Sequence, residues 1–282
     1  MLSSQYKSKF SQGANLFPRS LIFFEIEEKR DGTLIITSDL DVLSRSKKKW
    51  KYRFQRKEIE REFRFKTFLN KDLIPFFIKS KKNVFLPINA DFDYGIQFLK
   101  DYPKASEFYE EINNFYIDNK KKTSKINTLF ASLNYGNKLK KQQKSNSNIV
   151  VYNASGSSLN ASVIDNEKQK VIIGSENYYY STNSKNEAYY LSAILNDPNL
   201  SKNIKLIKSS RHIHKRVFDF PIPTYDKNEI LHKRLTKIGK KCELLVYDLV
   251  MNNPRISTEK VKTILYQKLI KIQKLTEQVF LE

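Results

Sequence analysis

The sequence is poor in cysteine and has no long hydrophobic run. Its single cysteine, Cys242, excludes an internal disulfide bond, and its position in an apolar helical pattern predicts a small core residue. The longest apolar run, residues 21–24, is far too short to cross a bilayer. No N-terminal stretch has the apolar region of a signal peptide. We therefore expect a cytoplasmic protein that has no membrane partner.

Acidic residues are scarce relative to basic ones. Lysine and arginine number 51 against 30 aspartate and glutamate residues, which gives a formal net charge of +21. A balance this basic favours a polyanionic partner, nucleic acid before an anionic membrane. Hydrophobic residues make up 40% of the 282 positions. The chain is therefore long and apolar enough to bury a core.

Residues 17–90 have the pattern of strands, and two β-rich runs flank the turn signal Asp31-Gly32, which predicts a hairpin. A helix is expected over 92–117. The lysine-rich stretch 118–148 is expected to be a mobile basic loop. Its lysines are either solvated or track phosphates, and composition leaves both interpretations open.

Two amphipathic helices end the chain, one from about 229 to 251 and one from Ser257, a plausible N-cap. Their apolar stripes predict contact with a partner or with the body of the protein. The predicted fold class is α+β. We expect a β-rich domain with inserted helices over 1–225, followed by a C-terminal helical hairpin over 226–282.

Basic residues alternate with aromatic ones between Arg45 and Lys57. This alternation predicts a strand with one aromatic and one cationic face. Such a strand either lies on a nucleic-acid backbone with a ring stacked on a base, or is an edge strand protected by lysine. The net charge favours the first interpretation. The candidate contacts are Lys48, Lys49, Trp50, Lys51 and Arg53.

A second dense group of positive charge lies in the loop 209–216, before a stiff Pro221-x-Pro223 segment. Such a loop places cations on phosphates or on guanine edges, or is a solvated basic turn; composition does not decide. Its candidate contacts are Arg211, His212, His214, Lys215 and Arg216. His212 and His214, with His232 as a third, are candidate zinc ligands, but no cysteine or carboxylate nearby completes the set, so no metal site is predicted.

Paired carboxylates at Asp39/Asp41 and Asp91/Asp93 lack the companion lysine of a nuclease site. We interpret both pairs as surface turns and predict no catalytic residue.

Several segments together resemble a known family. In the family's order they are QGANLFPRSLIFFEI (12–26), KKKWKYRF (47–54), NKDLIPFFI (70–78), VVYNASGSSLNASVID (150–165), EAYYLSAILNDP (187–198) and RHIHKRVFDFPIPTYD (211–226). The set is similar to the C-terminal target-recognition region of adenine-specific DNA methyltransferases of restriction–modification systems. The first segment adds Arg19 to the candidate DNA contacts. The chain is shorter than the family just before Arg211, where a longer loop is usual.

The resemblance implies a β-rich DNA target-recognition domain, followed by helices, that works with an N-terminal catalytic domain. We expect this chain to lack that domain, since the pattern begins within about ten residues of Met1. The chain also lacks a glycine-rich cofactor turn and an Asn/Asp-Pro-Pro-aromatic loop for a flipped adenine. We expect no cofactor on this chain and S-adenosylmethionine on a catalytic partner subunit.

The hypothesis is sequence-specific binding of double-stranded DNA as the recognition part of such a methyltransferase, with no enzyme activity expected of the chain alone. Two alternatives stay open: a non-functional remnant of a split methyltransferase gene, and a general RNA-binding protein.

Overall fold

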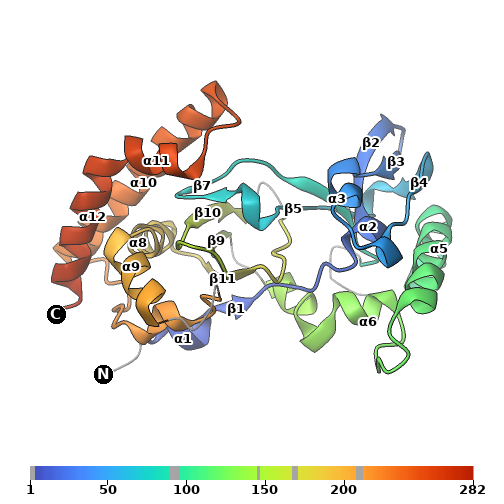
Figure 1. Cartoon of the computed structure of the whole chain (residues 1–282), viewed down its shortest axis with the longest axis horizontal. Helices are drawn as coiled ribbons and strands as arrows, with labels where there is room; N and C mark the ends of the chain where they lie inside the picture. The colour runs from blue at the N-terminus through green and yellow to red at the C-terminus, as the bar shows by residue number, and fades with distance from the viewer. Residues whose placement is uncertain (1–3, 89–95, 145–146, 167–170, 208–211, 282) are drawn as a thin grey trace.

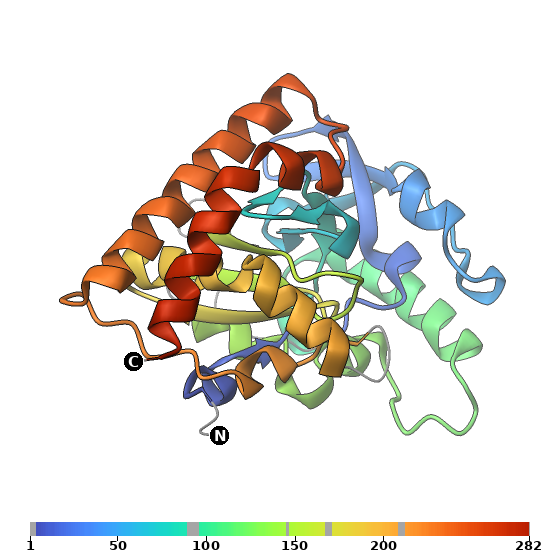
Figure 2. The ribbon, with the colours of Figure 1, turned by 60° about the vertical axis from the view of Figure 1, so that its left-hand side comes forward.

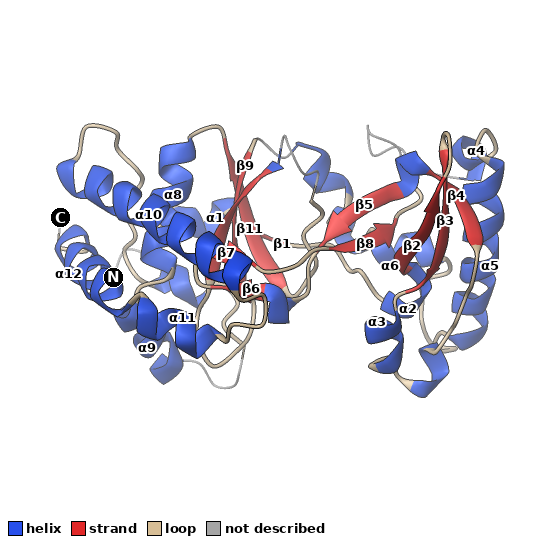
Figure 3. Ribbon diagram, turned by 90° about the horizontal axis from the view of Figure 1, so that it is seen from above, coloured by secondary structure: helices blue, strands red, loops and turns tan. Residues whose placement is uncertain are grey.

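A computed structural model of the chain describes residues 4–88, 96–144, 147–166, 171–207 and 212–281. The fold is mixed α+β, with antiparallel sheets and a helical C-terminal region, which confirms the predicted class. Two large hydrophobic clusters organise the molecule and lie toward opposite ends of it (Figure 1, Figure 3). We call them the first core, around a five-stranded sheet, and the second core, around a four-stranded sheet.

The first core is built on an antiparallel sheet in which sequence neighbours form hairpins. Its strands in spatial order are β4 (Lys57–Glu60), β3 (Thr33–Ser38), β2 (Phe23–Lys29), β8 (Lys82–Phe85) and β5 (Arg64–Thr67). The predicted hairpin joins β2 to β3, and Gly32 in its turn has φ +70°, a conformation that glycine adopts without strain. Helix α5 (Pro103–Asn119) buries Phe108 and Ile112 in this core, as the predicted helix requires.

The second core is built on a smaller antiparallel sheet. Its strands in spatial order are β1 (Ser11–Gln12), β11 (Asn177–Thr182), β9 (Asn148–Asn153) and β10 (Ala161–Asp165). Helix α8 (Lys185–Leu195) packs on β9 and β10 and is buried over most of its length. Ser184 caps it by accepting a hydrogen bond from the Glu187 amide at 3.2 Å. A short hairpin of β6 (Leu73–Ile74) and β7 (Phe77–Ile78) adjoins β10.

The C-terminal helices complete the second core. The predicted first helix is α10 (Ile230–Asn252), and it packs on α8 (Figure 2). Gly239 lies where the two helices approach most closely, since a Cβ there would be 2.5 Å from the Tyr189 carbonyl oxygen. The predicted second helix is in fact two, α11 (Thr258–Ile264), capped by Ser257, and α12 (Tyr266–Val279). Their apolar stripes are buried in the second core, and so is Cys242, whose core role is confirmed.

The basic stretch 118–148 is not one continuous loop, which corrects the prediction. It contains α6 (Leu129–Leu133) and the 3-10 turns η4 (Tyr135–Asn137) and η5 (Lys140–Lys144). Leucine side chains from this stretch are buried in the first core at positions 129, 133 and 139. The buried Gln142 side chain bonds both the amide and the carbonyl of Ile173, at 2.8 and 2.9 Å. The lysines of the stretch 118–148 therefore extend from a backbone that is held in place by these contacts. The predicted domain limits at 225 and 226 stay a prediction.

Three short helices lie outside the predicted pattern: α1 (Tyr6–Lys9), α2 (Arg19–Ile22) and α3 (Leu40–Ser44). A longer one, α9 (Pro198–Ile207), follows α8. The single helix predicted over 92–117 is two in the described residues, α4 (Ile96–Leu99) and α5. The stiff Pro221-x-Pro223 segment is preceded by a 3-10 turn, η6 (Arg216–Asp219), in which Val217 and Phe218 turn into the second core. Across the described ranges, no helix has the length and apolar character to span a membrane.

Candidate nucleic-acid interface

The first basic segment, residues 45–57, keeps the predicted alternation but is not a strand. A 3-10 turn, η1 (Lys48–Trp50), is followed by irregular backbone. The Trp50 ring is only 5% exposed and stacks on Tyr116 of α5, with 5.6 Å between ring centroids. Tyr52 donates a hydrogen bond to Glu111 of the same helix. These contacts hold the segment against α5 rather than against a sheet edge, which explains why no regular strand forms.

Burial removes Trp50 from the surface that a nucleic acid would meet. The hypothesis that its ring stacks on a base is therefore wrong for this conformation. Its role is to anchor the segment. Lys49 lies over the indole, with 5.0 Å from Nζ to the ring centroid, and donates to the Asn119 carbonyl at 3.2 Å.

Three other cations of this segment are exposed, whereas Arg56 and Lys57 at its end pair with acidic side chains. Lys48, Lys51 and Arg53 are exposed, and within the described part of the chain none of them forms an ion pair. An exposed cation with no acidic partner keeps its full charge available to a phosphate. These three residues are therefore free to bind a polyanion without first breaking a salt bridge.

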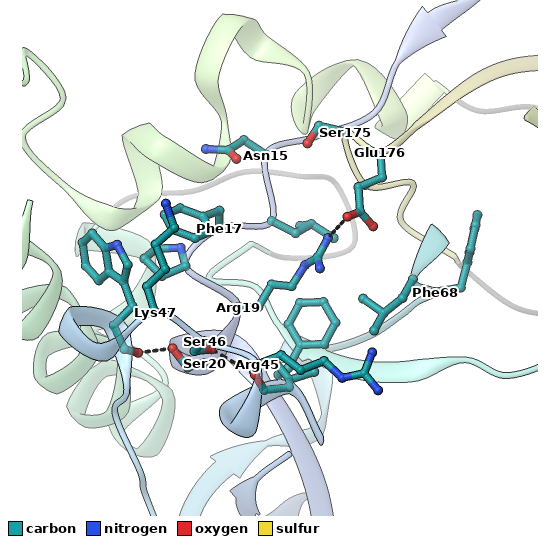
Figure 4. A pocket seen from close by; sticks show the side chains of 17 residues that line it. Asn15, Phe17, Arg19, Ser20, Arg45, Ser46, Lys47, Phe68, Ser175 and Glu176 are labelled. Atoms are coloured by element: carbon teal, nitrogen blue, oxygen red, sulfur yellow. Dashed lines mark hydrogen bonds and ion pairs between the residues drawn. The ribbon is translucent and has the colours of Figure 1, made fainter. Parts of the chain in front are cut away.

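Arg19 lies at the start of α2 and lines a pocket of about 380 Å³ together with Arg45, Lys47 and Trp50 (Figure 4). Its guanidinium Nη2 lies 2.6 Å from Oε1 of Glu176, on the opposite wall. Arg45 pairs with Asp41 at 2.9 Å, whereas Lys47 is exposed and has no ion pair among the residues described. The candidate Arg19 thus lies beside the first basic segment, but its charge is balanced by the Glu176 carboxylate.

The second basic segment is described from His212 to Arg216; Arg211 lies outside the described residues. The His212 and His214 rings are both exposed and stack on each other, with centroids 5.0 Å apart. The His214 carbonyl accepts a hydrogen bond from Tyr152 at 2.8 Å, and its backbone has φ +45°. The loop is therefore fixed to the sheet of the second core by its main chain, and the two imidazoles stay at the surface.

The two fixed charges of this segment that the structure describes, Lys215 and Arg216, are engaged within the protein. Lys215 Nζ donates to the Lys7 carbonyl at 2.7 Å, and burial, with a smaller contribution from the Lys7 charge, lowers the pKa of Lys215. Arg216 lies 3.6 Å from the Asp219 carboxylate, which also accepts from Lys7 at 2.7 Å. Neither cation is as available as those near Trp50.

Glu176 links Arg19, which lies beside the first basic segment, to the second basic segment. Arg19 contacts one carboxylate oxygen, and the Asn70 amide donates to the other at 3.2 Å. The Asn70 side chain in turn donates to the Ser155 carbonyl at 3.4 Å, and Ser155 forms a β-bridge with His212. A chain of contacts therefore runs from Arg19 across the junction of the two cores to the backbone of His212. Sequence reasoning missed Glu176 and Asn70, because nothing in their local pattern marks them.

The third histidine and the paired carboxylates lie in other surroundings. His232 is buried, and its Nδ1 accepts from the Asp226 amide at 2.9 Å, so it does not face the other two histidines as a zinc ligand. No cluster of three metal-binding side chains occurs in the ranges that the structure describes. Asp39 is not in a surface turn, which corrects that prediction. It is buried, caps α3 through the Val42 amide and pairs with Lys82. Asp91 and Asp93 lie outside the described ranges.

Comparison with known proteins finds no matching family model and no matching curated protein. Several solved structures are similar to the chain, two of which are described here. One is the type IIL restriction-modification enzyme MmeI in complex with DNA, with a TM-score of 0.49, 8% identity, and coverage of 99% of this chain and 33% of that one. The other is the type IIG restriction endonuclease BpuSI, with a TM-score of 0.40, 13% identity, and coverage of 96% and 30%. The chain spans about a third of each neighbour's length. At these values the likeness carries no argument about function.

Proposed function

We propose that this chain binds double-stranded DNA in a sequence-specific manner, as the recognition part of an adenine-specific DNA methyltransferase of a restriction–modification system. The observation that carries the proposal is the surface across the junction of the two cores. There Arg19 lies in one pocket with Lys47 of the first basic segment, whose exposed cations Lys48, Lys51 and Arg53 follow, and a chain of contacts links Arg19 to the second basic segment.

The physical basis is the release of counterions from the phosphate backbone. Each phosphate that a lysine or arginine neutralises contributes about −0.9 to the slope of log K against log salt on duplex DNA. Unpaired, exposed cations contribute most, because no internal salt bridge has to be broken. The backbone beneath them is held by Trp50 on Tyr116, which limits the entropy lost when the segment is ordered on a ligand.

The test is a matched pair of triple variants, measured by anisotropy of a labelled duplex over about 50 to 200 mM salt. The variant Lys48→Ala/Lys51→Ala/Arg53→Ala should weaken binding to all duplexes and flatten the slope by about 2.7, at about 0.9 per phosphate contact. The control is Arg234→Ala/Lys237→Ala/Lys241→Ala. It removes the same number of exposed lysines and arginines from α10, in the second core.

The control should change the slope far less. Equal effects of the two variants would show that binding follows net charge alone and has no defined surface. Tighter binding to single-stranded RNA than to duplex DNA would contradict the proposal in favour of the RNA alternative. No binding to any nucleic acid would favour the non-functional remnant.

The second part of the proposal is that methyl transfer is supplied by a separate catalytic domain or subunit that binds S-adenosylmethionine. The support is the missing cofactor turn and base-flipping loop in the sequence. Calorimetry of the chain with S-adenosylmethionine should show no binding. Methyl transfer to any duplex by the chain alone would contradict this part and leave DNA binding untouched.

A further inference from the structure

The Arg19–Glu176 ion pair joins the two halves of the candidate interface. Arg19 begins α2 beside the first core, and Glu176 precedes β11 in the sheet of the second core. The side chains are 34% and 38% exposed, so both are accessible from solvent. An ion pair this exposed adds little to the stability of a protein. A role in holding the fold together therefore does not account for it.

Both partners are held in place before any ligand arrives. The second carboxylate oxygen of Glu176 accepts the Asn70 amide, and the Glu176 carbonyl accepts the Ala154 amide at 2.8 Å. The guanidinium of Arg19 uses Nη2 for Glu176, and its other nitrogens have no hydrogen bond to the residues that the structure describes. The ion pair thus presents the fixed carboxylate of Glu176, a hydrogen-bond acceptor, next to guanidinium N–H groups of Arg19 that have no partner among the described residues.

A pair of this kind suits a base edge better than a phosphate. The Glu176 carboxylate cancels the charge of Arg19 and would repel a phosphate placed against the guanidinium. In the major groove, a G·C pair presents the acceptors O6 and N7 of guanine beside the N4 amino donor of cytosine. Arginine binds the first two atoms with two donors, and a glutamate accepts from the third. The ion pair therefore presents the complementary donors and acceptor side by side.

The surroundings supply the contacts that position a duplex. Lys47 and Arg45 line the pocket wall next to Arg19, and the exposed imidazoles of His212 and His214 lie beyond Asn70 and Ser155 (Figure 4 shows the Arg19 side). Contacts to phosphates fix the register of a protein on DNA, and base contacts between them provide specificity. A neutral pair flanked by cations has that arrangement.

We propose that Arg19 and Glu176 together read one G·C base pair of the target duplex, with Arg19 donating to guanine and Glu176 accepting from cytosine N4. Asn70 is a positioning residue for Glu176. The inference rests on the proposed function, since it names the specificity-determining side chains of the same DNA surface.

The decisive experiment uses a pool of duplexes with a randomised core, selected by binding to the full chain and then sequenced. The wild type should enrich a motif that contains a fixed G·C pair. The double variant Arg19→Gln/Glu176→Gln leaves the net charge of the chain unchanged, so phosphate binding and the salt slope should stay as in the wild type. It should lose the preference at that one position, by about 5- to 150-fold, and keep the rest of the motif.

Lys47→Ala is the matched control from the same pocket. It removes a cation without a partner, so it should weaken all sequences alike and leave the motif intact. Circular dichroism and the emission of Trp50, the sole tryptophan, which also lines the pocket, verify that each variant is folded.

The outcomes separate the two proposals. A wild-type chain that binds no duplex overturns the proposed function. A wild type that enriches a motif which the double variant also enriches overturns the role of Arg19 and Glu176 only. Binding of duplexes without any motif overturns this inference together with the sequence-specific part of the proposed function.

Discussion

The two basic segments look alike in the sequence, yet the structure treats their charges differently. In the first, Lys48, Lys51 and Arg53 are exposed and have no acidic partner in the described part of the chain. In the second, Lys215 donates to a backbone carbonyl and Arg216 pairs with Asp219. Charge density along a sequence therefore does not measure the charge that a ligand meets.

The difference has a physical cause in how each segment is anchored. Apolar contacts of Trp50 and Phe54 hold the middle of the first segment, so Lys48, Lys51 and Arg53 are not needed for packing. Toward its ends, Arg45, Arg56 and Lys57 pair with acidic side chains. In the second segment, the His214 carbonyl accepts from Tyr152 of β9, and both described fixed cations are engaged within the protein.

The largest effect on stability is expected from deleting the C-terminal helices, which share the second core with the second basic segment. Deleting residues 254–282 should abolish cooperative urea unfolding and make the chain aggregate. The removed helices share the second core with Ile213, Val217 and Phe218 of the second segment. They contribute buried side chains at Val261, Leu265, Leu269, Ile272, Leu275 and Val279. Truncating a single such side chain costs about 2–5 kcal/mol, and a typical domain has only about 5–15 kcal/mol in total.

A point variant on the solvent side of the same helix provides the control. Lys271 is exposed on α12, so Lys271→Ala should stay within about 0.5 kcal/mol of the wild type. A soluble deletion variant with a sharp unfolding transition would show that the second core does not need these helices.

The next largest effect on stability is expected from comparing one side chain in each basic segment, Trp50 in the first and His214 in the second. Trp50→Ala should lower the free energy of unfolding by about 3–5 kcal/mol, because it removes a buried ring that stacks on Tyr116. His214→Asn should change it by about 0.5 kcal/mol or less, because the ring is exposed and asparagine tolerates a positive φ. Urea unfolding of both variants measures the difference. Equal losses would mean that the second segment also depends on a side-chain anchor.

Much of the fold is predictable from local signals, and most of the site is not. The Asp31-Gly32 hairpin, α5 and α10 follow from turn chemistry and periodicity. The strand predicted around Trp50 is wrong because Tyr116 and Glu111, distant in sequence, determine its conformation. The structured part of 118–148 depends on Gln142 bonding Ile173. The Arg19–Glu176 pair likewise forms only when the two cores meet, and no local pattern encodes that meeting.

A smaller effect, on the salt slope of duplex binding, is expected from removing the fixed charges Lys215 and Arg216 of the second segment. From composition alone, Lys215→Ala/Arg216→Ala would flatten the salt slope by roughly 2, at about 0.9 per contact. The structure lowers that expectation to less than about 0.9, because Lys215 is partly buried and bonded to Lys7, and only Arg216 can exchange its partner for a phosphate. Anisotropy with the duplex series used for the first segment measures it. A flattening as large as that of the first segment's triple variant would show that the internal contacts break on binding.

The smallest change in the salt slope should come from removing an acidic partner, which frees cations instead of deleting them. Asp219 accepts from Lys7 at 2.7 Å and lies 3.6 Å from Arg216. Asp219→Asn keeps the shape of the side chain but frees both cations, so the salt slope should steepen by up to about 0.9 per new phosphate contact. Asp248→Asn, at an exposed position of α10, controls for the loss of one negative charge. If Asp219→Asn tightens duplex binding and Asp248→Asn does not, the second segment lies on the DNA and is restrained by its own acid. If the two variants are alike, only the first segment and the junction meet the duplex.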